Sequence, residues 1–341
     1  MPQYDLTARL LWLRAVPFFR TLTPVDLARV AESMTTRTFE KGEVMLREDE
    51  PPRSMFMIDL GTVTLRRKGL RIGVVRAPGG VGFLSIIARN SGGTEAIAES
   101  YVESYELSVD LLDDVFEDHF QVLLGMIRWV TSRFLSESRD RPAPMLTLPE
   151  FPFEHLVSDG ELGIVERIFL LRSAVVFKGA NVNSIARLAR AMKEIRTPEE
   201  KVLWEIGDPS TGPYFIVKGR GELVWNEGKT VQQVGTGYVV GGAESIVGAP
   251  RWNRFVMHGP GVLLKGSREA LIDMFEDDHA AAIQFLSTVA SALMMAWDRN
   301  AEAGVLSVGS DDTSSFDRAE DDDDDDDESS EPAAPPGAAV R

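Results

Sequence analysis

The chain has 341 residues, of which 44% are hydrophobic, and it contains no cysteine. This length is typical of two globular domains, and the lack of cysteine excludes disulfides, thiolate metal sites and a cysteine nucleophile. The net charge of −17 comes mainly from residues 304–341, which hold 13 acidic residues and two arginines and leave 40 acidic and 34 basic residues elsewhere. Neither part has the basic face that nucleic-acid binding requires.

The N-terminus lacks a basic start followed by a long apolar stretch, so the sequence predicts no signal peptide and a cytoplasmic location. No uninterrupted apolar run approaches the length of a membrane span, so we expect no membrane partner.

Helical and strand patterns follow one another in the first half of the chain. Apolar residues at helical spacing predict a short helix over 6–14. Thr23 and Pro24 predict an N-cap, with proline at the first position of a second helix. From Thr36 the apolar period shifts towards two, which predicts a barrel of short strands joined by glycine turns. Helical spacing returns over 111–138.

The second half repeats this plan, with helical patterns over 162–172, 183–195 and 268–299 around strands over 196–264. Matching segments recur 158 residues apart: LRAVPFF at 13–19 and LRSAVVF at 171–177, LARVA at 27–31 and IARLA at 185–189, EVML at 43–46 and KVLW at 201–204, MIDLG at 57–61 and IVKG at 216–219. One constant offset of this length indicates a tandem duplication of a domain, since solenoid repeats are much shorter. Four prolines in residues 139–152 predict a linker between the copies.

In both halves the motifs and their order resemble those of the cyclic nucleotide-binding domain family. Each half has a leading helical pair, a G-E-x-(I/V)-like strand, an (F/Y)-I-V-x-x-G-like strand, a glycine-led cassette and closing helices, and the resemblance covers roughly residues 10–300. It implies an α+β fold of two tandem jelly-roll or β-barrel domains with flanking helices. The expected division is a first domain at 1–140, a linker at 141–160, a second domain at 161–303 and a disordered acidic tail at 304–341.

The candidate binding site lies in the second cassette and consists of Gly241, Gly242, Glu244, Arg251 and Trp252. A helix that starts inside a barrel exposes unpaired backbone N–H groups, which favour an anion, and Arg251 could pair with the same anion. The resemblance implies a ribose-binding glutamate and a phosphate-binding arginine. Here Arg251 matches the arginine, whereas Gly242 takes the glutamate position and Glu244 follows two residues later. Two alternatives remain open for these residues. Glu244 is either a displaced ribose ligand or an ordinary surface residue, and Trp252 either stacks on a base or only packs within the fold.

In the first cassette, Phe83 takes the glutamate position, and the arginine position falls on Gly92 or Thr94. An apolar ring cannot accept a hydrogen bond from ribose, so we expect the first site to be inactive. Phe83 should point into the barrel or the former pocket, and no arginine should reach that pocket.

The sequence predicts a protein that is not an enzyme, because no nucleophile or acid–base constellation is apparent and the four histidines are scattered, without metal-ligand spacing. We expect no catalytic or metal-binding residues. The favoured function is a regulatory or adaptor protein that acts through contacts with protein partners, or with further copies of itself, without tight cAMP binding. The alternative is a ligand-responsive sensor that binds a cyclic nucleotide or a related small phosphate at the second domain; a cyclic nucleotide is therefore the one candidate cofactor.

Overall fold

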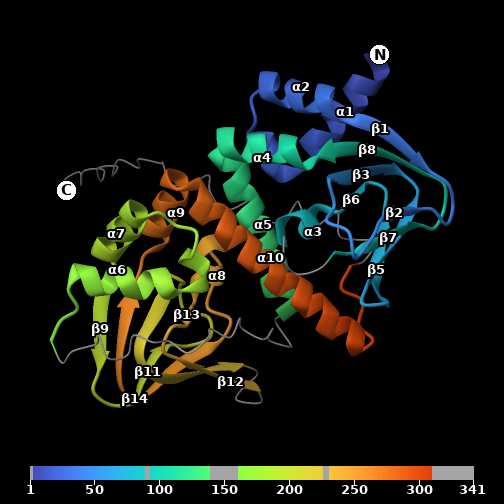
Figure 1. Ribbon diagram of the computed structural model, residues 1–341. Helices are drawn as coiled ribbons and strands as arrows, with labels where there is room; N and C mark the ends of the chain where they lie inside the picture. The colour runs from blue at the N-terminus through green and yellow to red at the C-terminus, as the bar shows by residue number, and fades with distance from the viewer. Residues whose placement is uncertain (1–2, 89–92, 139–159, 226–229, 309–341) are drawn as a thin grey trace, which may run out of the picture.

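The computed structural model describes residues 3–88, 93–138, 160–225 and 230–308. Almost all of the predicted linker, and the predicted tail from residue 309 onward, lie outside these ranges. Both halves are antiparallel β structures flanked by helices, which confirms the α+β fold class (Figure 1).

The first half begins with three helical segments, which are α1 (Gln3–Ala15), the 3-10 turn η1 (Pro17–Thr21) and α2 (Pro24–Ser33). Its β structure consists of β1 (Thr35–Phe39), β2 (Val44–Leu46), β3 (Ser54–Leu60), β4 (Thr62–Arg67), β5 (Leu70–Arg76), β6 (Gly79–Val81), β7 (Glu95–Ala98) and β8 (Val102–Ser108), with the short helix α3 (Phe83–Ala88) after β6. Two four-stranded sheets result, in the orders β1-β8-β3-β6 and β2-β7-β4-β5. Helices α4 (Val109–Asp118) and α5 (Phe120–Ser138) close this half. The predicted N-cap of α2 is confirmed, because the Thr23 hydroxyl accepts a hydrogen bond from the Asp26 N–H at 3.2 Å.

The second half repeats this order, beginning with α6 (Ile164–Ser173), the 3-10 turn η3 (Val175–Phe177) and α7 (Val182–Ala191). Its strands are β9 (Lys193–Thr197), β10 (Lys201–Trp204), β11 (Tyr214–Trp225), β12 (Thr230–Gly235), β13 (Val239–Val240) and β14 (Arg254–Lys265), with α8 (Gly242–Val247) after β13 and α9 (Arg268–Asp277) and α10 (His279–Glu302) at the end. They form a six-stranded sheet in which β10-β14-β11-β12 is the main order, while β13 pairs with β11 and β9 pairs with β14.

Equivalent elements confirm the duplication. The offset is 158 residues at the start of α2 and α7, and it becomes 159 residues at the start of α3 and α8. The second half therefore has one more residue than the first between the starts of these two helices. Gly61 and Gly219 are equivalent glycines with φ of 103° and 108°. A Cβ on Gly61 would lie 2.3 Å from the Tyr101 carbonyl oxygen, so this close approach requires glycine.

One predicted helix boundary is wrong, and two predicted helical stretches are divided. The helix predicted over 183–195 ends at Ala191, because residues 193–197 pair with β14 as strand β9. The closing helical stretches predicted over 111–138 and 268–299 are each two helices, separated at His119 and Asp278, where the backbone leaves the helical conformation.

The predicted start of the tail at 304 is also wrong, because residues up to 308 pack on the first half. The N–H groups of Ser307 and Val308 donate to the Ile72 carbonyl oxygen at 3.0 and 3.1 Å. The Val308 carbonyl oxygen accepts from the Val74 N–H at 3.0 Å, and the Val308 side chain is buried. A Cβ on Gly73 would lie 1.9 Å from the Val308 oxygen, so glycine makes this pairing sterically feasible.

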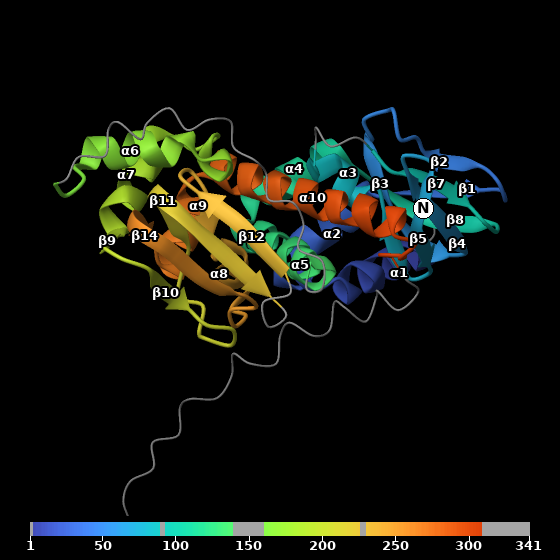
Figure 2. The same cartoon turned by 90° about the horizontal axis from the view of Figure 1, so that it is seen from below.

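The closing helices join the halves. Helix α10 runs from the second barrel to the first, where it packs against α3, α5 and β5, as Figures 1 and 2 show. In return, α5 of the first half packs against α8 of the second. Each closing helix therefore contacts the cassette helix of the other half.

Polar contacts fix this arrangement. The Arg67 guanidinium pairs with the Asp298 carboxylate of α10 at 2.7 Å, and both side chains are buried. The Asn300 amide donates to the Glu137 carboxylate of α5 at 2.9 Å. Of the helices in the described ranges, α10 alone has a length and composition that could cross a membrane, and half of its most apolar window is buried inside the protein.

Candidate functional site

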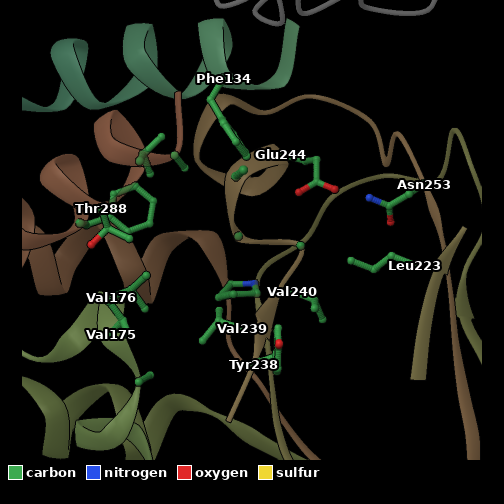
Figure 3. Close-up of a pocket in the computed structure, with 18 of the residues that line it drawn as sticks. Phe134, Val175, Val176, Leu223, Tyr238, Val239, Val240, Glu244, Asn253 and Thr288 are labelled. Atoms are coloured by element: carbon green, nitrogen blue, oxygen red, sulfur yellow. The ribbon is translucent and has the colours of Figure 1, made fainter. Parts of the chain in front are cut away.

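A cavity of about 200 Å³ lies beside α8 in the second half (Figure 3). Its walls come from several elements: Val239 and Val240 from β13, Val176 from η3, and Thr288 from α10. Phe134 of α5 reaches the cavity from the other half of the chain. One side chain of the first half therefore completes a cavity that is otherwise lined by the second half.

The lining is mostly apolar and contains no cation. Among the described residues that line it there is no lysine, arginine or histidine, and Glu244 is the only carboxylate. Thr288 does not offer a free hydroxyl hydrogen, because this group donates to the Gln284 carbonyl oxygen at 2.7 Å within α10. The local charge is therefore unfavourable for a phosphate.

Glu244 lies in the first turn of α8, and Figure 3 shows its side chain among those that line the cavity. The residue is 3% exposed, and its Oε1 atom has no hydrogen-bond partner. Burial raises the pKa of this carboxyl group, although its own backbone, the charge of Arg251 and a hydrogen bond with Trp252 act in the opposite direction. An unsatisfied buried carboxyl oxygen is unusual, and it indicates a position where a ligand could donate a hydrogen bond.

Arg251 lies behind the cavity wall and is 2% exposed. Its Nη1 donates to the Gly241 carbonyl oxygen and its Nη2 donates to the Gly212 carbonyl oxygen, both at 2.7 Å. The guanidinium carbon lies 4.2 Å from the centre of the Trp204 ring. Burial lowers the pKa of Arg251, an effect that the charges of Glu244, Tyr214 and Asp208 oppose. Arg251, which the sequence predicted to bind a phosphate, thus uses its terminal nitrogens to bind backbone carbonyl oxygens.

Gly241 makes this position of Arg251 sterically feasible. A Cβ on Gly241 would lie 2.2 Å from the Arg251 Nη1 atom, and its φ of 71° also favours glycine. Gly242, the next residue, is less restricted, because a Cβ added there would have Pro213 Cβ as its nearest neighbour, at 3.7 Å. Steric contact with Arg251 therefore requires glycine at position 241, whereas no close contact requires glycine at position 242.

Trp252 packs edge-to-face against Trp225, with ring centroids 5.5 Å apart, and both line the cavity. The structure thus brings Gly241, Gly242, Glu244 and Trp252 to one cavity and leaves Arg251 outside its lining. The sequence interpretation missed Phe134, Val176, Tyr238 and Thr288, which come from separate elements and share no motif.

The equivalent cavity of the first half is smaller, at about 140 Å³, and is lined by aromatic side chains. Phe83 lies there, buried, with its ring centroid 6.5 Å from that of Phe18 and 5.5 Å from that of Trp129. Trp297 enters from α10 of the other half. The predicted position of Phe83 is therefore confirmed.

The prediction that no arginine reaches the first cavity is wrong, because Arg76 and Arg133 line it. Neither comes from the cassette, and Arg133 donates to the Glu137 carboxylate and to the Ser307 carbonyl oxygen. Thr94 is buried at the cavity wall, whereas Gly92 lies outside the described residues. Within the described ranges, no group of three acidic or histidine side chains could hold a metal ion.

No family model matches the chain. Among solved structures, it is similar to the regulatory domain of Toxoplasma gondii PKA with cAMP, at 15% identity and a TM-score of 0.32, covering 84% of this chain and 97% of that one. It is also similar to the regulatory subunit of a cAMP-independent protein kinase A from Trypanosoma cruzi bound to guanosine, at 14% identity and a TM-score of 0.34, covering 83% and 87%. The sensor domain of the transcriptional regulator DNR from Pseudomonas aeruginosa matches 35% of this chain and 83% of its own, at 15% identity and a TM-score of 0.32.

Likenesses this distant carry no argument about ligand or activity. The order of elements is the same in each half: leading helices, a jelly roll interrupted by a short helix, and two closing helices. The chain is therefore a tandem pair of antiparallel β domains with flanking helices, and the order of elements in each resembles that of cyclic nucleotide-binding domains.

Proposed function

We propose that the chain is a non-enzymatic regulatory protein that acts through protein contacts and does not bind cAMP tightly. The observation that supports this most directly is the position of Arg251, whose terminal nitrogens donate to two backbone carbonyl oxygens. A cyclic phosphate in the second cavity would meet the Glu244 carboxyl group and no lining cation. Releasing Arg251 to bind a phosphate would leave the carbonyl oxygens of Gly241 and Gly212 without these donors.

Exposed apolar side chains support a role in protein contacts. Val165 and Phe169 lie four residues apart on α6, so they share one face of this helix, and they are 58% and 55% exposed. Large exposed apolar side chains at this spacing are typical of surfaces that a partner covers.

Calorimetric titration of the full chain with cAMP and cGMP tests the absence of tight binding. We expect no saturable heat at micromolar nucleotide. A dissociation constant below about 1 μM, equivalent to about −8 kcal/mol, would contradict the proposal.

The variant Arg251→Ala tests the structural role of the arginine. Loss of its hydrogen bonds should lower the free energy of unfolding by about 1.5–3 kcal/mol without any ligand. Arg254→Ala is the matched control, because Arg254 is partly exposed and pairs with Glu205 at 3.0 Å. Equal stability of the two variants would remove Arg251 from its structural role.

The second candidate is a sensor that binds a cyclic nucleotide at the second half, which the 200 Å³ cavity favours. Under this alternative, Arg251 would rotate onto the phosphate, and Arg251→Ala would weaken nucleotide affinity by about 10- to 150-fold. The same calorimetric titration separates the two functions.

A further inference from the structure

We propose that the second cavity is a binding site for a small aromatic molecule that carries one N–H or O–H donor and no negative charge, a class that includes indoles and phenols. This inference goes beyond the proposed function, which concerns protein contacts and weak nucleotide binding. It can fail independently of that function.

The size and the walls of the cavity fit such a molecule. An engineered apolar cavity of about 150 Å³ holds benzene, and the volume here is about 200 Å³, which leaves room for a bicyclic ring. Val175, Val176 and Phe285 line one part of the cavity, and Trp225 and Trp252 line another. Apolar and aromatic walls with few polar groups are typical of small-molecule pockets.

Glu244 specifies the polar feature of the ligand. Glu244 lines the cavity, and its Oε1 atom is buried and lacks a hydrogen-bond partner, so it can accept a bond from a ligand donor once the neighbouring side chains shift to admit it. An anion at the same place would lie beside this carboxyl group and would find no cation in the lining. The site therefore selects for a donor and against a phosphate or carboxylate.

The first half supplies a natural comparison, because Phe83 and Gly242 are equivalent residues at the start of α3 and α8. Phe83 contributes its ring to the smaller, aromatic cavity, whereas Gly242 contributes no side chain. A Cβ on Gly242 would make only ordinary contacts, at 3.7 Å from Pro213 and 4.0 Å from Val239. Gly242→Phe should therefore place a ring in the second cavity and reduce its volume, as the ring of Phe83 occupies the equivalent place in the first half.

The test is a ¹⁹F NMR titration of the full chain with 5-fluoroindole and with 5-fluoro-1-methylindole, which has the same ring but no N–H donor. We expect wild type to bind 5-fluoroindole at least tenfold more tightly than the methylated probe. Glu244→Met should bind both probes equally, because it keeps the length of the side chain and loses the acceptor. Glu244→Gln retains a carbonyl oxygen and should keep part of the preference.

Gly242→Phe should abolish binding of both probes, and Val25→Phe, at a 73% exposed position of α2, should leave binding unchanged. Absence of 5-fluoroindole binding by wild type would overturn the proposal. So would unaltered binding by Gly242→Phe, or the same preference in Glu244→Met as in wild type. A parallel cAMP titration separates the hypotheses: loss of indole binding alone refutes this inference, whereas tight cAMP binding refutes the proposed function.

Discussion

The two cassette cavities occupy equivalent places in equivalent folds, yet their contents differ. In the first, Phe83, Phe18, Trp129 and Trp297 provide an aromatic lining around about 140 Å³. In the second, Gly242 leaves about 200 Å³ open next to a buried carboxyl group. Aromatic rings occupy more of the first site, whereas the second keeps a larger open volume and a buried carboxyl group.

This difference shows how a duplicated domain can divide its tasks. The first copy lines its cavity with aromatic side chains, and its closing helix α5 supplies Phe134 to the second cavity. The second copy retains a cavity, and its closing helix α10 supplies Trp297 to the first. A ligand in the second cavity would therefore touch side chains of both copies.

The largest expected effect comes from removing the buried contact between the copies. Asp298→Ala leaves the Arg67 guanidinium, whose side chain is 2% exposed, without its carboxylate partner. We expect a loss of about 3–5 kcal/mol in the free energy of unfolding, measured by urea denaturation. Glu106→Gln, which disrupts the exposed pair with Arg37, is the control and should cost much less. Similar losses in the two variants would show that the buried pair does not hold the copies together.

The stability that Asp298→Ala loses should depend on pH. Burial alone would raise the pKa of Asp298, but hydrogen bonds from Arg67 and Lys68 outweigh it and lower the pKa. The contribution of the pair is therefore complete above the ordinary pKa of 3.8 and is lost as pH falls through the lowered value. The stability difference between wild type and Asp298→Ala should shrink in acid.

Phe83→Ala should make the first cavity resemble the second. Removing this ring should cost about 3 kcal/mol, because the surrounding aromatic side chains can collapse only in part. Gly242→Phe is the reverse change and should alter stability by much less. Thermal unfolding of both variants checks the comparison, which fails if filling the second cavity destabilises as strongly as emptying the first.

Truncation separates the packed end of the chain from the acidic tail. Ending the chain after Ala303 removes Val308, which lines the first cavity, and should cost about 1.5–3 kcal/mol. Deleting Asp311–Arg341 should leave the melting temperature nearly unchanged, because a run of seven aspartates offers nothing apolar to bury. Equal melting temperatures of the two truncated proteins would contradict the packing role of residues 304–308.

The smallest expected effect concerns the buried carboxyl group of the second cavity. Burial raises the folded-state pKa of Glu244 above its ordinary value of 4.5, so the protonated form favours folding. This stabilisation is complete below pH 4.5 and is lost as pH rises through the raised pKa. Glu244→Gln should therefore be more stable than wild type at pH 8, by about 1 kcal/mol, and should lose that advantage in acid. A difference that does not vary with pH would show that Glu244 does not titrate in this way.

The sequence predicted the duplication and the place of each cassette, because helix caps, glycine turns and apolar periods are local signals. It could not predict the orientation of Arg251. That orientation depends on the missing Cβ of Gly241 and on the Trp204 ring, which lies 47 residues earlier in the chain. The arginine matches a phosphate-binding position in sequence, and only tertiary packing shows that its donors are already used.

The sequence also could not predict that each half contributes an aromatic side chain to the cavity of the other. Phe134 and Trp297 lie on helices whose apolar periodicity is satisfied by any packing partner, so the pattern alone does not say which cavity each one reaches. Their positions follow from the docking of α5 and α10 on opposite cassettes.

The continuous helix α10 has a consequence for how the molecule unfolds. It packs against η3 and α9 of its own half and against α3 and β5 of the other, so one rigid element contributes to the cores of both. Melting of either half would strip this helix of part of its apolar cover, including the surroundings of Trp297. The two copies should therefore unfold cooperatively, with a single calorimetric transition whose enthalpy corresponds to the whole folded chain, even though each copy is of a size that commonly folds alone.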